Sequence, residues 1–489
     1  MIDNILFTFV KMAIRKQYIN HLDEIVVTNA LLHALHKEDF NPTEEIKDSS
    51  LSLLDLKETL VEYALKQRII EDSTSQKEQF GAYIMSFITP LPSVLNTTFW
   101  EKYAYNPQEA TDYFYTLSQE NDYIKTKDIA KNQQFFYDGK YGTLHITINL
   151  SKPEKDPKDI VLASQHQSVN YPVSQLTMTN EGYYGRINHP ARSQHRLVRV
   201  NVNGENWGLQ YSPYAYFNEH CIFLSQDVRP MHIDRACFSN LLHLVRQFPH
   251  YFVGSNAGLP IVGGSILSHD HYQAGRFTFP MELASIDYSV EIKGVKVSVL
   301  NWPMTTLRLE SANKDTLLDV AEHILSRWKN YTNEDLHILS HTHGEMHNTI
   351  TPIARLKENI YELDLVLRNN RTSEQYPDGI FHPHPEVQHI KKENIGLIEV
   401  MGLAILPPRL KSELQEVEEY LLGKQTQVAA IHQEWAEHLA KGTDRLSVRQ
   451  EIERGVGEVF EKVLEHAGVF KRDEQGQRAL KDFVESLKW

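Results

Sequence analysis

The stretch YFVGSNAGLPIVGGSILSHDHYQ, residues 251–273, holds the pattern that decides the fold. Its two ends, 251–256 and 266–274, are typical of strands, and a glycine-rich connection separates them. Immediately upstream, 219–225 predicts another strand and 233–248 predicts an amphipathic helix. Before them, the alternating runs 196–202 and 207–211 predict two strands, and Asn203-Gly204 marks a hairpin turn between them. The order strand, helix, strand, strand predicts a compact α+β unit.

The end of this stretch, HDHYQ at 269–273, carries the candidate chemistry. Because residues two apart in a strand share a face, His269, His271 and Gln273 would project together. A neutral imidazole is a good nucleophile towards phosphorus, and the ordinary histidine pKa of about 6.5 leaves it mostly neutral at pH 7. Gln273 can donate a hydrogen bond to a phosphoryl oxygen without acting as an acid. Three glycines just upstream let backbone N–H groups approach an anion: Gly258, Gly263 and Gly264.

Two other interpretations of this face stay open. Two histidines on one strand face are also typical of a metal site or of a polar surface stripe. The glycines, with Asn256 and Ser265 beside them, favour covalent transfer through a histidine over either alternative.

The patterns along the chain predict four consecutive parts. Residues 1–135 are mainly helical, 136–290 form a first half around the stretch above, 291–425 form a second half, and 426–489 form a helical tail. The second half repeats the order of the first in a looser form, which indicates two related α+β halves. Its expected strands and one helix are, in order, 295–309, 315–328 (the helix), 348–355, 361–367 and 395–403.

Composition limits the class of protein. The chain has 489 residues, enough for two or three packed units, and its net charge of −14 argues against a surface that binds nucleic-acid backbones. Its two cysteines, Cys221 and Cys237, form no Cys-x-x-Cys pair and are too few for a disulfide framework. No segment approaches the roughly 20 apolar residues of a membrane span, so we expect a cytoplasmic protein that binds no membrane.

Several long motifs resemble, in the same order, those of the class II galactose-1-phosphate uridylyltransferases, also called UDP-glucose–hexose-1-phosphate uridylyltransferases. This family is a branch of the histidine-triad superfamily whose third position is glutamine, here Gln273. The resemblance is dense from about 110 to 415 and implies two related histidine-triad-like half-domains, each an antiparallel sheet with helices. The motifs are EGYYGR (181–186), NHPAR (188–192), QYSPY (210–214), NEHC (218–221), FPHYFVGSN (248–256), HNTITPIAR (347–355), ELDLVLR (362–368), GIFHPH (379–384) and KKENIGLIEVM (391–401).

The resemblance implies a ping-pong reaction of galactose metabolism, the Leloir pathway. His271 would take the uridylyl group from UDP-glucose, release glucose 1-phosphate, and pass the group to galactose 1-phosphate to give UDP-galactose. Gln273 would bind a phosphoryl oxygen of the intermediate, and Asn256 and Ser265 would line the phosphate path. Other substrate contacts are expected from Lys391, Lys392 and Glu399, and Arg186, Arg192 and Arg196 are candidate anion partners because a guanidinium suits phosphate. Surface ion pairs are the alternative for each arginine, and the resemblance also allows a homodimer.

The family's metal ligands are only partly present. Many members carry a Cys-x-x-Cys zinc pair where this chain has Ser174 and Thr177, and hydroxyl groups are poor zinc ligands. We therefore expect that this site is lost, that hydrogen bonds hold His220 and His269, and that the chemistry requires no cofactor. A second cluster, a structural zinc or iron site, would consist of Glu282, His347, His382 and His384, with the last two sharing a strand face. The alternative is that these histidines contact substrate phosphate.

Other functions remain open. A metal-dependent nucleotide phosphohydrolase could use the same histidines, and a nucleotide phosphorylase of the same superfamily would share the covalent chemistry. An inactive nucleotide-binding protein is the third possibility. Gln273 argues against hydrolysis, and the presence of His271 together with Asn256 and Ser265 argues against an inactive protein.

Overall fold

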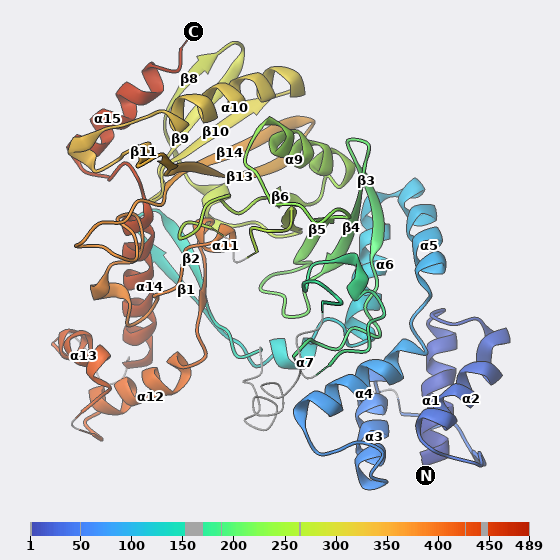
Figure 1. Cartoon of the computed structure of the whole chain (residues 1–489). Helices are drawn as coiled ribbons and strands as arrows, with labels where there is room; N and C mark the ends of the chain where they lie inside the picture. The colour runs from blue at the N-terminus through green and yellow to red at the C-terminus, as the bar shows by residue number, and fades with distance from the viewer. Residues whose placement is uncertain are drawn as a thin grey trace. The chain divides into compact units, whose positions relative to one another are not determined.

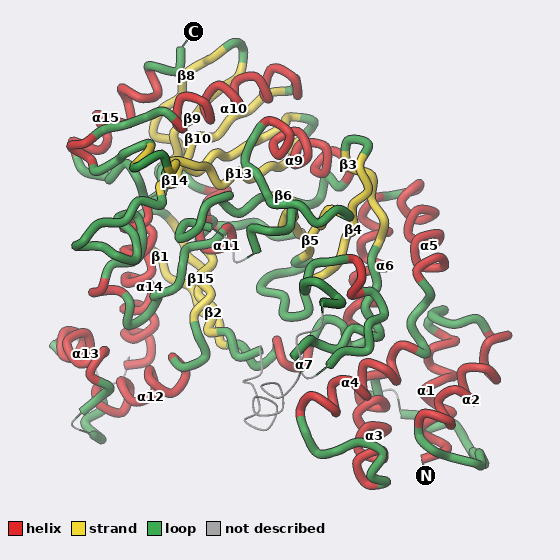
Figure 2. The backbone as a smooth tube through the Cα atoms, viewed as in Figure 1, coloured by secondary structure: helices red, strands yellow, loops and turns green. Residues whose placement is uncertain are grey.

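The computed structural model describes residues 2–48, 50–151, 170–186, 188–263, 266–425, 427–441 and 448–488. The contacts within the chain divide it into two compact units (Figure 1). The first unit comprises 1–130, 151–215 and 219–228, and the second comprises 131–150, 216–218 and 229–489. Helices and antiparallel strands are both abundant, so the predicted α+β class is confirmed (Figure 2). The division into four consecutive parts stays a prediction.

The N-terminal part of the first unit is helical, as predicted. Ser52 and Asp55 form a reciprocal capping box at the start of α3, and Pro92 and Pro107 begin α5 and α6, where a missing N–H costs nothing. The apolar residues Leu22 and Ile25, which the spacing places on a helix, are 78% and 72% exposed, so this stripe lies outside the core. The helices are α1 (Ile2–Arg15), α2 (Glu24–Ala34), α3 (Leu53–Lys66), α4 (Thr74–Ser86), α5 (Pro92–Tyr105), α6 (Pro107–Glu120) and α7 (Thr126–Ile129).

The first unit also contains three antiparallel strands, β3 (Val198–Val202), β4 (Glu205–Tyr211) and β5 (Cys221–Ser225). Asn203 and Gly204 join β3 to β4 with φ values of 50° and 93°. A two-residue hairpin turn requires such left-handed conformations, so the Asn-Gly signal in the sequence is confirmed.

The second unit contains a large antiparallel sheet. Helices α9 (Arg235–Gln247) and α10 (Lys314–Lys329) cover one face of it (Figure 1). Its strands are, in spatial order, β7 (His271–Gly275), β6 (Phe252–Gly254), β13 (Asn348–Lys357), β14 (Ile360–Asn369), β10 (Thr306–Ser311), β9 (Val295–Leu300) and β8 (Ile286–Ile292).

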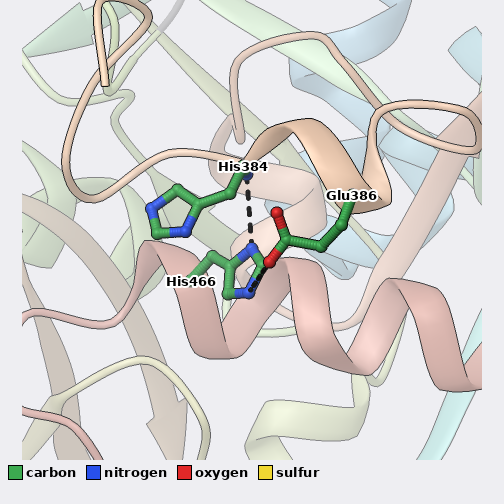
Figure 3. A group of neighbouring side chains, drawn as sticks. All are labelled: His384, Glu386 and His466. Atoms are coloured by element: carbon green, nitrogen blue, oxygen red, sulfur yellow. Dashed lines mark hydrogen bonds and ion pairs between the residues drawn. The ribbon is translucent and has the colours of Figure 1, made fainter. Parts of the chain in front are cut away.

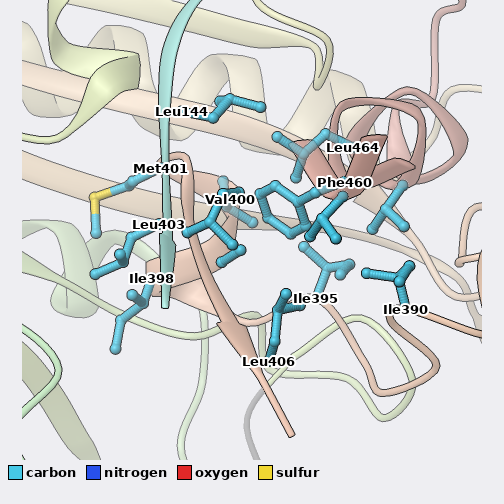
Figure 4. Packing of buried hydrophobic residues seen from close by; sticks show 14 of the residues in the cluster. Leu144, Ile390, Ile395, Ile398, Val400, Met401, Leu403, Leu406, Phe460 and Leu464 are labelled. Atoms are coloured by element: carbon cyan, nitrogen blue, oxygen red, sulfur yellow. The ribbon is translucent and has the colours of Figure 1, made fainter. Parts of the chain in front are cut away.

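A smaller sheet and the C-terminal helices complete the second unit. In this sheet β2 (Gly142–Ile148) lies between β1 (Gln133–Gly139) and β15 (Leu403–Leu406). Apolar residues of the 390–406 segment pack there against Phe460 and Leu464 of α14 (Figure 4). The remaining helices are α11 (Leu397–Val400), α12 (Leu410–Leu421), α13 (Gln433–Ala440), α14 (Val448–Ala467) and α15 (Glu474–Glu485), so the helical tail is confirmed.

Several predicted strands differ from the structure. The single strand predicted at 295–309 is two strands, β9 and β10, which pair with each other antiparallel because the chain reverses between residues 300 and 306. The strand predicted at 266–274 begins only at His271, so His269 precedes it. The run 395–403 is the short helix α11 followed by β15, because Glu399 accepts a hydrogen bond from the backbone N–H of Gly396 and Gly402, at φ 97°, ends the turn. A continuous apolar run does not distinguish a buried strand from a buried helical turn. His382 and His384 lie outside any strand, so they share no strand face.

None of the helices within the described residues is long and apolar enough to cross a membrane.

Candidate active site

His271 is the first residue of β7, and its side chain is buried. Its Nδ1 lies 2.7 Å from the backbone carbonyl oxygen of His269, which can only accept a hydrogen bond. Nδ1 therefore carries the proton, and the lone pair of the neutral ring is at Nε2. His269 contributes its backbone carbonyl to this contact and not its side chain. The backbone before β7 is irregular, and it directs that carbonyl at the His271 ring.

Burial lowers the pKa of His271 below the ordinary histidine value. The hydrogen bond to the His269 carbonyl opposes this effect, and the His269 ring adds to it. The imidazole is therefore neutral at pH 7 and has a fixed tautomer, which is the form that can attack a phosphorus atom.

Asn256 follows β6 by two residues, at the end of the sheet where His271 begins β7. Gly254 of β6 pairs antiparallel with Gln273 of β7, so the chain runs from Gly254 to Asn256 in the same direction as from Gln273 back to His271. The backbone N–H of Leu397 donates to Asn256 Oδ1 at 3.0 Å. This contact occupies the amide oxygen and leaves the Nδ2 hydrogens available to donate to a phosphoryl oxygen.

Lys391 and Glu399 are buried and pair with each other through Lys391 Nζ and Glu399 Oε1. Burial disfavours the charged form of Lys391, but the Glu399 carboxylate outweighs it and raises the pKa of the lysine. Lys391 also donates to the carbonyl of Ile405 at 3.2 Å. Lys392 is exposed instead and lines a cavity of about 950 Å³ with residues such as Trp435 of α13.

The three candidate arginines lie in the first unit. Arg186 donates to the carbonyl of Tyr171 at 2.6 Å, and Arg192 lies over the ring of Tyr123. Arg196 is buried and donates to the carbonyls of Pro90, Ser193 and His195, so its visible role is to hold the backbone of this unit. The binding of anions by these arginines stays a prediction.

Ser174 and Thr177, the predicted positions of the lost zinc ligands, belong to a small hydrogen-bonded turn. Thr177 Oγ1 donates to the carbonyl of Ser174 at 3.0 Å, and the buried Asn180 amide donates to the same carbonyl at 2.7 Å. Ser265, the other predicted phosphate contact, lies outside the described residues.

The four predicted metal ligands have separate partners. Glu282 forms ion pairs with Arg355 at 3.2 Å and Lys357 at 3.0 Å. His347 contacts Thr342 Oγ1 and, at 2.9 Å, Asn370 Oδ1. His382 Nε2 lies 3.0 Å from Asn394 Oδ1.

Only His384 of these four belongs to a group of possible metal ligands within the described residues. Its group consists of His384, Glu386 and His466, whose ligand atoms all lie within 4.8 Å of one another (Figure 3). The backbone N–H of His384 donates to His466 Nδ1 at 3.3 Å, and His466 Nε2 lies 3.5 Å from Glu386 Oε1. Burial and the neighbouring His384 lower the pKa of His466 to about 4, so this imidazole is neutral at pH 7.

Arg368 is the notable buried residue that sequence reasoning did not select. It lies on β14 within the motif 362–368 and is 1% exposed. Its Nη1 donates to Thr351 Oγ1 at 3.2 Å and its Nη2 to the carbonyl of Ile395 at 2.9 Å. The signal was present in the sequence, because Arg368 directly follows the apolar run 365–367, and a charged residue in a buried strand requires a partner.

Comparison with known proteins gives one consistent family. The model of the galactose-1-phosphate uridyl transferase N-terminal domain matches residues 18–230, and that of the C-terminal domain matches 244–437. A galactose-1-phosphate uridylyltransferase of Ligilactobacillus salivarius is 51% identical, covering 99% of this chain and 98% of that protein. Proteins of the same name from Streptococcus pneumoniae and Streptococcus thermophilus are 52% and 50% identical, each covering 98% or more of both chains. Among solved structures, yeast Ap4A phosphorylase is 12% identical and covers 69% of this chain and 96% of its own, with a TM-score of 0.35.

Proposed function

We propose, from the premise that the chain belongs to the galactose-1-phosphate uridyl transferase family, that it is a UDP-glucose–hexose-1-phosphate uridylyltransferase. Its substrates and products are UDP-glucose, glucose 1-phosphate, galactose 1-phosphate and UDP-galactose. The observation that carries the mechanism is the 2.7 Å contact between His271 Nδ1 and the His269 carbonyl, which leaves Nε2 as the nucleophile.

The first half-reaction forms a covalent intermediate. His271 Nε2 attacks the α-phosphorus of UDP-glucose, a bond from Nε2 to phosphorus forms, and the bond to the bridging oxygen breaks. That oxygen leaves with its electron pair as part of glucose 1-phosphate. The proton stays on Nδ1, and the His269 carbonyl stabilises the positive charge that the ring acquires.

The second half-reaction restores the enzyme. A phosphate oxygen of galactose 1-phosphate attacks the same phosphorus, UDP-galactose forms, and His271 leaves as a neutral imidazole. The amides of Gln273 and Asn256 donate hydrogen bonds to the phosphoryl oxygens. Because neither step requires a proton from the enzyme, glutamine suits the position two residues after the nucleophile.

The proposal is tested by the mass of the intact protein after mixing with UDP-glucose and removing small molecules. We expect a gain of one uridylyl group that disappears when galactose 1-phosphate is added and that is absent in His271→Ala. His271→Gly should regain part of the activity when imidazole is added, because the free ring can enter the vacated space.

Other outcomes of the same experiment identify the alternatives. Steady release of UMP without a gain in mass would indicate a phosphohydrolase. A covalent group that inorganic phosphate removes and galactose 1-phosphate does not would indicate a phosphorylase. Retained transfer in His271→Ala would overturn the assignment of the nucleophile.

We also propose that a structural zinc or iron of the second unit, where present, binds to His384, Glu386 and His466 and not to the four residues predicted from the sequence. Glu282 of that set is already neutralised by Arg355 and Lys357. His384 Nε2 lies 2.9 Å from the carbonyl of Ile380, an arrangement that orients the ring and leaves Nδ1 for a metal. The homodimer allowed by the family resemblance remains a proposal that sedimentation can test.

A further inference from the structure

Arg368 carries a buried positive charge that no carboxylate within the described residues pairs with directly. Its hydrogen-bond acceptors, the Thr351 hydroxyl and the Ile395 carbonyl, are both neutral. Glu399 is the carboxylate that acts on it at longer range, but Glu399 is paired with Lys391. Lys391 also contacts Glu393 at 3.4 Å, but that carboxylate is 54% exposed and is screened by water. The buried groups alone therefore leave one positive charge in the protein interior, which is costly unless an anion binds nearby.

The register of the sheet places this charge on the same face as the nucleophile. Gln273 pairs with Gly254, Gly254 with Ile353, and Ile353 with Asp364, so these positions share one face. His271 lies two residues from Gln273, and Arg368 lies four residues from Asp364, so both side chains also project to this face. The guanidinium extends towards β13, where Thr351 accepts its hydrogen bond.

A chain of hydrogen bonds also links Arg368 to the active site. Its Nη2 holds the carbonyl of Ile395, two residues before the Leu397 N–H that donates to Asn256 Oδ1. Asn256 leaves β6 at the end of the sheet where His271 begins β7. Moving the 395–397 turn would therefore change the direction in which the Asn256 amide points.

We propose that Arg368 is a positioning residue for uridylyl transfer, which fixes the 395–397 turn and Asn256 and supplies a buried positive charge that favours an anionic phosphoryl group at His271. The proposal rests on the function proposed above. UDP-glucose brings an anionic diphosphate to His271, and the positive charge of Arg368 favours its binding and its reaction without Arg368 touching it.

The test is the rate of a single uridylylation of the enzyme by UDP-glucose, followed by intact mass, in wild type, Arg368→Gln and Arg368→Lys. The guanidinium reaches β13, which is two strands from β7, and neighbouring strands are about 4.8 Å apart, so it lies about 10 Å from His271. At an effective dielectric constant of about 20, a unit charge at that distance corresponds to roughly a tenfold effect on the rate. With the loss of positioning added, we expect Arg368→Gln to react 10- to 100-fold more slowly. Arg368→Lys, which keeps the charge, should regain part of the rate.

Thermal unfolding supplies a readout that a purely structural role would not move. In the His271→Ala background, UDP-glucose should raise the melting temperature by more when Arg368 is present than in His271→Ala/Arg368→Gln, because the charge of Arg368 favours the bound diphosphate. Arg308→Gln is the matched control, since Arg308 is also a buried arginine on the same face but is paired with Asp364 at 2.7 Å. It should lower stability and leave the uridylylation rate unchanged.

The outcomes separate this inference from the proposed function. If wild type is uridylylated and folded Arg368→Gln reacts within twofold of it, the role of Arg368 is overturned and the function stands. Equal rates for Arg368→Lys and Arg368→Gln would overturn the role of the charge. If Arg368→Gln does not fold, Thr351→Val keeps the charge and removes one hydrogen bond, and an unchanged rate in that variant would overturn the positioning role.

Discussion

Leu397 donates its backbone N–H to Asn256 Oδ1 at 3.0 Å, although 141 positions separate the two residues in the chain. The contact joins the glycine-rich connection before β7 to the turn that begins α11. Because an amide that accepts at its oxygen has its nitrogen on the other side, this single contact decides where the Nδ2 hydrogens of Asn256 point.

Asn256→Asp tests this orientation. The carboxylate can still accept from Leu397, so the turn stays in place, but the donor to the phosphoryl oxygen is lost and a negative charge replaces it. We expect kcat to fall about 100- to 1000-fold, the effect of removing one preorganised donor. Steady-state kinetics with UDP-glucose and galactose 1-phosphate measure it, and circular dichroism checks the fold. A decrease of less than fivefold would show that the Asn256 amide does not contact the reacting group.

Gly254→Ala tests the same contact through its donor residue, Leu397. A Cβ at Gly254 would meet Leu397 Cδ1 at 3.0 Å and the carbonyl of Pro352 at 3.1 Å, so Leu397, whose N–H holds Asn256, must shift. We expect a slower uridylylation, about tenfold. Gly208→Ala is the control, because its Cβ would meet Met178 and Leu197 side chains at similar distances in the first unit. Equal losses of rate in both variants would indicate a general loss of stability and not a displaced Asn256.

The sequence predicted those parts of the site that follow local patterns. The helices of the first 135 residues, the Asn203-Gly204 hairpin and strands β13 and β14 were all predicted from periodicity and turn residues. The alternation argument put His269 and His271 on one strand face, whereas the strand begins at His271 and the irregular backbone of His269 is what provides the carbonyl. The contacts of Asn256 and Arg368 depend on pairing between distant strands, which no local pattern encodes.

The dependence of the uridylylation rate on pH should reflect the lowered pKa of His271. Burial disfavours the imidazolium, so the neutral ring persists to a lower pH than a free histidine would allow. The rate should therefore stay constant from pH 8 down to about 6.5, where a free histidine is half protonated, and should fall only below that. Single-turnover rates across this range measure it. A rate already halved at pH 6.5 or above would contradict a buried, neutral nucleophile.

Metal content distinguishes the two sets of candidate ligands in the second unit. His384, Glu386 and His466 have ligand atoms within 4.8 Å of one another, whereas Glu282 is engaged by Arg355 and Lys357. Since a bound metal loses most of its affinity with one of its few protein ligands, His466→Ala should remove zinc or iron that the wild type carries after purification. Glu282→Gln and His347→Ala should retain it, as elemental analysis of the three variants would show. Retention in His466→Ala with loss in Glu282→Gln would restore the ligand set predicted from the sequence. Because His271 requires no Lewis acid, transfer activity in His466→Ala should fall no more than its stability does, and a chelator should leave the uridylylation rate unchanged.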